Sequence, residues 1–115
     1  MNATDRGQVI RLADAELGIP GPAGENAVLV LRRGSVDVKL SHPARPNQQT
    51  PHEQDEIYVV IRGRGTLLHD GARDRFESGD LLFVAAGTEH RFEDFSDDLA
   101  VWRIFYGPHG GEVPA

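Results

Sequence analysis

The 115-residue sequence contains no cysteine, and this absence excludes disulfide bonds, thiolate zinc sites and cysteine nucleophiles. Long apolar runs are also missing. The longest, Leu81 to Gly87, is far shorter than the roughly 20 residues of a membrane-spanning helix. The first eight residues lack the apolar stretch of a secretory signal. We therefore expect a soluble, cytoplasmic protein with no membrane partner.

Positive charge is scarce as well. Lys and Arg number 12 against 18 Asp and Glu, which gives a formal net charge of −6. Short basic pairs such as Arg32 and Arg33 do not extend into a basic run or stripe. Because nucleic acids require a concentrated positive surface, we expect no nucleic-acid partner.

Short β-type runs separated by turn residues fill the chain from Ala27 onward. Residues 35–40 alternate between polar and apolar, and the pair Asp70-Gly71 between two extended runs is typical of a hairpin turn. Eight or nine short strands predict an all-β domain, either a barrel or a two-sheet jelly roll. Runs such as Tyr58 to Ile61 are apolar on both faces. We therefore expect their outer side to pack against a second layer, and a homodimer would supply it.

The length allows one domain with one hydrophobic core. We divide the chain into an N-terminal strand and irregular arm (1–26), a barrel (27–107) and a flexible tail (108–115). The N-terminal strand, around Val9 to Leu12, is expected to help pair the two subunits.

Two of the five histidines, His52 and His90, lie in strand-like segments and are candidate metal ligands. His52 and Glu56 are four residues apart, so their side chains point to the same face of an extended segment. Glu56 also shares its parity with Tyr58 and Val60, on a face that turns apolar. Two neutral imidazoles and one carboxylate form the facial triad that binds Fe(II), Mn(II) or Zn(II) and leaves coordination positions open.

The spacing around these residues resembles the two motifs of the cupin superfamily, specifically the small single-domain type-2 cupins. The retained positions read His52-x3-Glu56-x6-Gly63 and then Gly79-x7-Gly87-x2-His90. The resemblance spans residues 35–106 and implies a double-stranded β-helix, which is a jelly-roll barrel. It also implies that His52, Glu56 and His90 bind one divalent transition metal (Fe, Mn, Ni or Zn) at the mouth of the barrel.

The sequence departs from the family pattern at the position of the first motif histidine, where it has Thr50. A neutral hydroxyl does not compete with imidazole for a metal. Gln48 or Gln49 could supply a weak oxygen ligand, or water could fill the position. Three further motif positions also differ: the upstream glycine, the proline and the asparagine of the pattern are Ala44, Ala85 and Asp94.

The resemblance implies a metal-dependent enzyme acting on a small organic molecule, by dioxygenase-type or isomerase/lyase-type chemistry. In the second type, Glu53 or Tyr58 would serve as the base. Glu53 and Asp55 otherwise belong to the solvated face of their strand, and the face that Arg103 occupies stays open, since both faces of residues 99–106 are apolar. The alternative function is a non-catalytic cupin that binds or senses a small ligand with a weakened or lost metal site. In that case His52 and His90 would be partly buried histidines hydrogen-bonded to carboxylates.

Overall fold

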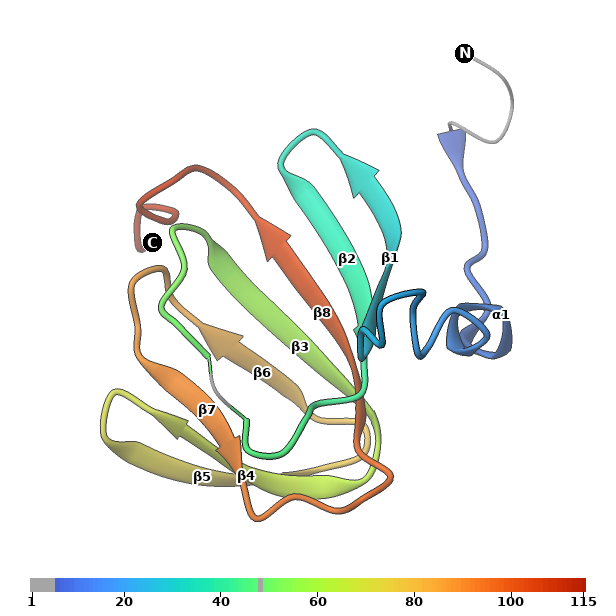
Figure 1. Ribbon diagram of the computed structural model, residues 1–115. Coiled ribbons are helices and arrows are strands. Elements are labelled where there is room, and N and C mark those ends of the chain that lie inside the picture. Colours follow the sequence, from blue (N-terminus) through green and yellow to red (C-terminus); the bar gives the residue numbers. More distant parts are fainter. Residues whose placement is uncertain (1–5, 48) are drawn as a thin grey trace.

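The computed structural model describes residues 6–47 and 49–115, which form one short helix and eight strands (Figure 1). The elements are α1 (Leu12–Glu16), β1 (Ala27–Arg33), β2 (Val36–Ser41), β3 (Asp55–Arg62), β4 (Arg64–His69), β5 (Ala72–Glu77), β6 (Leu81–Val84), β7 (His90–Glu93) and β8 (Ala100–Tyr106). The all-β prediction is therefore confirmed. The strands begin and end close to the Gly-rich turns that mark them in the sequence.

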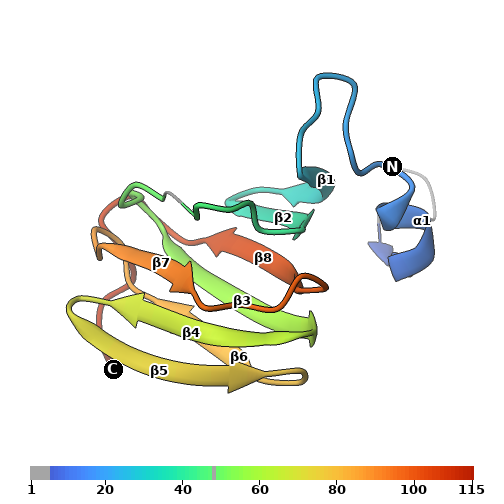
Figure 2. The ribbon, with the colours of Figure 1, turned by 60° about the horizontal axis from the view of Figure 1, so that its bottom comes forward.

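The strands form two antiparallel sheets that face each other (Figure 2). The larger sheet has the order β1-β2-β8-β3-β6, and the smaller has the order β5-β4-β7. Strands far apart in the sequence become neighbours, because β8 lies between β2 and β3. This is the predicted jelly roll, in which the two sheets enclose the core without a hydrogen-bonded strand pair joining them among the described residues.

The hydrophobic core lies between the two sheets. On β3, Glu56, Tyr58 and Val60 alternate inward and are nearly inaccessible, as the strand period of two requires. Aromatic rings fill much of the space, and Phe92 on β7 packs against the rings of Tyr58 and Phe76 with centroids 5.0 and 5.5 Å apart. The core cluster comprises Tyr58, Val60, Leu67, Phe76, Val84, Phe92, Phe95, Leu99 and Val101.

Two tight turns have the geometry that their sequences predict. Asp70 and Gly71 join β4 to β5 with φ values of +48° and +82°, and the flanking residues His69 and Ala72 are paired. Two successive positive φ values are those of the two-residue hairpin that Asp-Gly favours. A single residue, Gly63, separates β3 from β4, and its φ is +89°.

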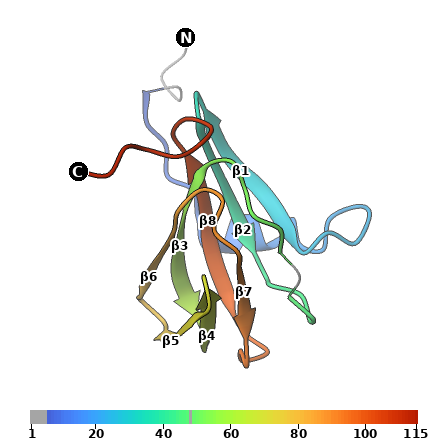
Figure 3. The same ribbon diagram turned by 90° about the vertical axis from the view of Figure 1, so that its left-hand side faces the viewer.

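The N-terminal arm differs from the prediction. Within the described chain, residues 7–11 belong to no strand, and residues 12–16 form α1 beyond the β1 edge (Figures 1 and 2). The connection that follows projects away from both sheets, as Figure 3 shows. The expected edge strand is therefore absent from the described residues, where Leu12 belongs to α1 and lies apart from the free edge of β1. Its pairing with a second subunit stays a prediction.

Ionic contacts attach α1 to the end of the larger sheet. Both carboxylate oxygens of Glu16 accept hydrogen bonds from the Arg62 guanidinium, at 2.7 and 3.0 Å, and His42 Nε2 lies 3.2 Å from the same carboxylate. The hydrogen bonds from Arg62 lower the pKa of Glu16, and the carboxylate in turn raises the pKa of Arg62. A two-pronged contact of this kind fixes orientation as well as distance.

Candidate metal centre

The structure brings together the three side chains that the sequence proposes as ligands. One ligand atom from each of His52, Glu56 and His90 lies within 4.8 Å of the others. His90 Nε2 is 3.1 Å from Glu56 Oε1, and His52 Nδ1 is 3.5 Å from the same oxygen. Their proximity is observed, whereas their role as metal ligands remains a prediction.

The ligands come from both sides of the sandwich. Glu56 points inward from β3 of the larger sheet, and His90 is the first residue of β7 in the smaller sheet. His52 lies just before β3, where its ring packs edge-on against Phe105, with centroids 4.7 Å apart. The N–H of Gly87 donates to the His52 carbonyl at 2.7 Å, so a backbone hydrogen bond connects the two sequence motifs.

The hydrogen bonds of His90 indicate which of its nitrogens is free. Nδ1 lies 2.9 Å from the Thr88 carbonyl, an acceptor, so Nδ1 carries the proton. Nε2 then presents its lone pair towards Glu56. The Tyr58 hydroxyl lies 3.3 Å from Nε2, but its single proton goes to Gln49 Oε1, 2.9 Å away. A lone pair and a carboxylate oxygen thus face each other at 3.1 Å, an arrangement that calls for a cation or a proton between them.

Glu56 gives a second observation that fits a metal. Its side chain is 0% exposed, and within residues 6–47 and 49–115 neither carboxylate oxygen has a hydrogen-bond partner. A buried carboxylate without hydrogen bonds is costly, because it has lost its water and gained no donor. One carboxylate and two imidazoles make a donor set that suits Fe, Mn, Ni or Zn. The residues therefore fit a divalent transition metal.

The pKa values of the titratable groups differ in direction. Burial lowers the pKa of His52, which keeps this ring neutral and able to ligate at neutral pH. Burial also acts to lower the pKa of His90, but the Glu56 carboxylate and the Thr88 carbonyl outweigh it, so the net pKa is raised. Burial raises the pKa of Tyr58 far above its usual range. Tyr58 therefore stays protonated and can donate a hydrogen bond, and it is poorly suited to the role of base.

Thr50, which stands at the position of the first motif histidine, is exposed. The Gln49 side chain accepts the hydrogen bond of Tyr58 and donates to Asn47 Oδ1 at 2.8 Å. It therefore approaches the site through the Tyr58 hydroxyl, which lies 3.3 Å from His90 Nε2. Gln48 lies outside the described residues.

The two acidic residues before Glu56 behave differently from each other. The Glu53 side chain is 77% exposed, and its carboxylate lies 3.0 Å from His109 Nδ1, which places this candidate base in a surface ion pair. The expectation that Asp55 is solvated is wrong, because Asp55 is only 5% exposed. Its carboxylate accepts hydrogen bonds from the backbone N–H groups of Ala86 and Glu112, each at 2.9 Å, and these replace water.

Arg103 is the functional candidate whose position the sequence leaves open. In the β3–β8 register it pairs with Tyr58, so it shares the inward face with Glu56. Arg103 Nε lies 3.9 Å from Glu56 Oε2. Arg103 and Tyr58 also line a cavity of about 350 Å³ whose other walls come mainly from the loop after β2. The cavity therefore adjoins the candidate metal centre through residues that approach two of its ligands.

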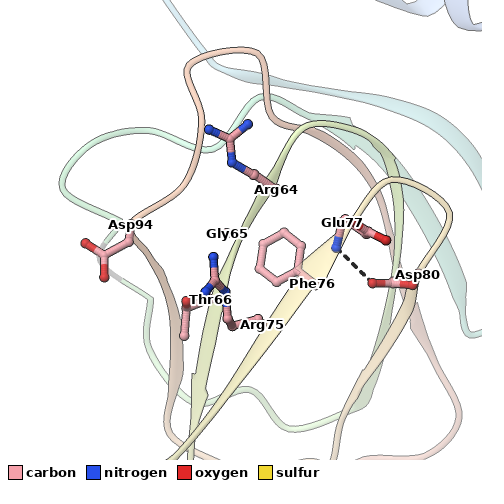
Figure 4. Close-up of a pocket in the computed structure, with 8 residues that line it drawn as sticks. All are labelled: Arg64, Gly65, Thr66, Arg75, Phe76, Glu77, Asp80 and Asp94. Carbon is pink, nitrogen blue, oxygen red and sulfur yellow. Dashed lines mark hydrogen bonds between the residues drawn. The ribbon is translucent and has the colours of Figure 1, made fainter.

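A larger cavity of about 600 Å³ lies elsewhere, at β4 and β5 (Figure 4). Phe76 and Gly65 line it, together with charged side chains of both signs that include Arg64, Arg75 and Asp94. The backbone N–H of Glu77 donates to the neighbouring Asp80 carboxylate at 2.8 Å. None of the three candidate ligands lines this cavity, so size alone does not locate the site.

Comparison with known proteins identifies the relatives of this chain. A family model described as a cupin domain matches residues 38–106. An uncharacterized protein of Streptomyces coelicolor is 32% identical over 77 residues, which are 67% of this chain and 73% of that protein. Acireductone dioxygenase 1 of Pectobacterium atrosepticum is 38% identical over 69 residues, covering 55% of this chain and 39% of the dioxygenase. The matched part of this chain therefore covers well under half the length of that enzyme.

Solved structures agree on the fold. A cupin 2 conserved barrel domain protein of Salinispora arenicola superposes with a TM-score of 0.63 at 18% identity, covering 88% of this chain and 90% of the other. A putative mannose-6-phosphate isomerase of Ralstonia eutropha gives 0.65 at 19% identity, covering 89% and 100%. In the part of the chain that the structure describes, no helix has the length and apolar character needed to cross a membrane.

Proposed function

Because the chain belongs to the cupin domain family, we propose that it binds one divalent transition metal through His52, Glu56 and His90 and acts on a small organic molecule. The observation that carries the proposal is the buried Glu56 carboxylate, which accepts no hydrogen bond from the described residues and faces the bare Nε2 of His90. Three protein ligands leave coordination positions for water and for oxygen atoms of a substrate.

The chemistry we propose is of the dioxygenase type, with isomerase or lyase chemistry as the other possibility. The similarity to acireductone dioxygenases of Pectobacterium atrosepticum and Schizosaccharomyces pombe, at 38% and 27% identity, supports the first. A bound ion would supply Lewis acidity or a redox centre for O₂. The Tyr58 hydroxyl lies beside His90 and donates its proton to Gln49. The rings of Phe105 and Phe92 pack against His52 and Tyr58 and form an apolar part of the inner wall. An isomerase or lyase would need a base, and neither the protonated Tyr58 nor the exposed Glu53 supports that role.

The second candidate function is a non-catalytic cupin that binds or senses a small ligand. Thr50 favours it, because this residue stands where the family has a fourth ligand and is exposed. The two functions differ in metal dependence. An enzyme loses turnover when His52 is replaced by alanine, whereas a metal-free binder keeps its ligand affinity.

Elemental analysis of untagged protein purified without chelator tests the proposal. We expect about one equivalent of Fe, Mn, Ni or Zn in the wild type and a substoichiometric amount in His90→Ala, because the variant keeps only two of the three protein ligands of the facial triad. The matched control is His69→Ala. His69 pairs with His90 across β4 and β7, but its ring binds Asp74 at 2.6 Å. Equal background metal in all three proteins would reject the metal proposal and favour the ligand-binding alternative.

We also propose that the protein is a homodimer formed through the outer face of the larger sheet. Leu81 and Phe83 are 64% and 51% exposed there, beside Ile57 and Val59 in the β3–β6 register. A second copy would cover these side chains with an equivalent apolar surface. Phe83→Lys should shift the mass in light scattering from dimer to monomer, whereas Leu17→Lys, at an exposed position on the arm, should not. A monomeric wild type would contradict the proposal.

A further inference from the structure

The cavity of about 350 Å³ beside the candidate metal centre has a single cationic side chain among its described lining residues, Arg103. Its other walls include Tyr58, Gln49, Asn47 and Phe92. A volume at the low end of the range for ligand sites suits a small organic molecule. Charge recognition in this cavity therefore depends on Arg103.

Arg103 has an unsatisfied donor. Its Nε is buried and, in the chain as described, donates no hydrogen bond. The nearest carboxylate oxygen, Glu56 Oε2, lies 3.9 Å away, which is too far for a hydrogen bond. The guanidinium lies over the Phe105 ring, 5.5 Å from its centroid, and the electrostatic attraction between cation and ring favours this position at the wall. A buried guanidinium N–H without an acceptor indicates that an oxygen-bearing partner is missing.

We propose that this cavity binds a small monocarboxylic acid, with the carboxylate of the ligand on Arg103. The planar guanidinium matches a carboxylate, which can accept two parallel hydrogen bonds. A single cation next to the negative Glu56 suits one negative charge better than the two of a phosphate monoester. Binding of the acid to Arg103 does not require a metal. The inference rests on the proposed function only in that the bound acid would lie next to the proposed metal ligands Glu56 and His90.

Calorimetric titration with a matched pair of probes, 4-methylpentanoate and its neutral amide, tests this assignment. Neither probe has a second oxygen group with which to chelate a metal. For the full chain, both metal-loaded and treated with chelator, we expect the acid to bind at least about tenfold more tightly than the amide, a difference of ~1.4 kcal/mol. In Arg103→Met the two probes should bind equally. Arg75→Met removes a cation from the other cavity (Figure 4) and should keep the preference.

A wild type that binds acid and amide equally overturns the proposal, and so does an Arg103→Met variant that keeps the preference. Arg103→Lys guards against a folding defect. Lysine keeps the positive charge but loses the planar guanidinium that donates two parallel hydrogen bonds, so we expect this variant to retain only part of the preference for the acid. Metal content separates this inference from the proposed function. Preference for the acid in protein that never carries metal supports the Arg103 site while rejecting the metal centre. Stoichiometric metal in a protein that does not prefer the acid supports the metal centre and rejects the Arg103 site.

Discussion

Glu56→Gln is expected to abolish stoichiometric metal binding and, at the same time, to stabilise the metal-free protein. The carboxylate is the only anionic member of the triad, so its loss should weaken metal binding more than about 100-fold, beyond the loss caused by removing a residue that only supports a ligand. Without an ion, the same buried carboxylate would have no hydrogen-bond partner among the described residues. An amide has the same shape, carries no charge and can donate its N–H to Nε2 of His90, 3.1 Å from Oε1 in the wild type.

The expected gain in the free energy of unfolding is about 1 to 3 kcal/mol, the usual cost of an unsatisfied buried polar group. The gain depends on pH. Burial opposes protonation of His90, but Glu56 and Thr88 raise its pKa overall, so protonated His90 stabilises the wild type below the unfolded-state pKa. That stabilisation is lost as the pH rises through the raised folded-state pKa. The advantage of glutamine should therefore be largest on the alkaline side of that pKa.

Urea denaturation in the presence of chelator, at pH 6 and pH 8, measures this change, and elemental analysis measures the metal. Glu53→Gln is the matched control, because this carboxylate is exposed and pairs only with His109 in the described chain. It should leave the metal content unchanged and alter stability little, as exposed ion pairs usually do. A Glu56→Gln protein that is less stable than the wild type at pH 8 would show that the carboxylate contributes to the metal-free fold.

Gly63→Ala is expected to destabilise the protein much more than Gly71→Ala. Both glycines have positive φ, +89° and +82°, so both substitutions carry the left-handed strain of about 1 to 2 kcal/mol. Only Gly63 is also crowded. An added Cβ would lie 2.8 Å from the backbone Cα of Leu99 and 2.7 Å from Ser96 Oγ, whereas nothing lies within 4 Å at Gly71.

Because the backbone of Leu99 cannot move out of the way as a flexible side chain can, overpacking at Gly63 should add about 1 to 3 kcal/mol. Thermal and urea unfolding of the two variants in parallel isolate this contribution, since the strain from φ is common to both. Equal losses of stability in the two variants would mean that the β3–β4 turn tolerates the contact, and that this motif glycine is needed for its φ alone.

The sequence predicted correctly whatever depends on local pattern. The period of two in β3 places Glu56 on the inner face with Tyr58, and the spacing of two motifs predicts the proximity of His52, Glu56 and His90. The turn at Asp70 follows from local φ preferences. Each of these inferences needs only a few neighbouring residues or a motif of fixed spacing.

The features that the sequence did not predict depend on distant partners. Asp55 looked solvated because the N–H groups that bind it belong to Ala86 and Glu112, much later in the chain. Arg103 lies in a strand that is apolar on both faces, so only its register with Tyr58 settles its direction. The arm before β1 contains a helix rather than a strand, and the ionic contact of this helix is with Arg62, which lies 46 residues after Glu16 in the sequence.

The division of the candidate ligands between two sheets has a kinetic consequence. Glu56 belongs to the larger sheet and His90 to the smaller, and in the described residues no hydrogen-bonded strand pair crosses from one sheet to the other. An ion held by both residues would act as a cross-link at the mouth of the sandwich. The sheets could then separate only after a coordination bond breaks, so occupancy would set the rate of unfolding as well as its equilibrium. The half-life of the folded protein would then depend on the concentration of available metal.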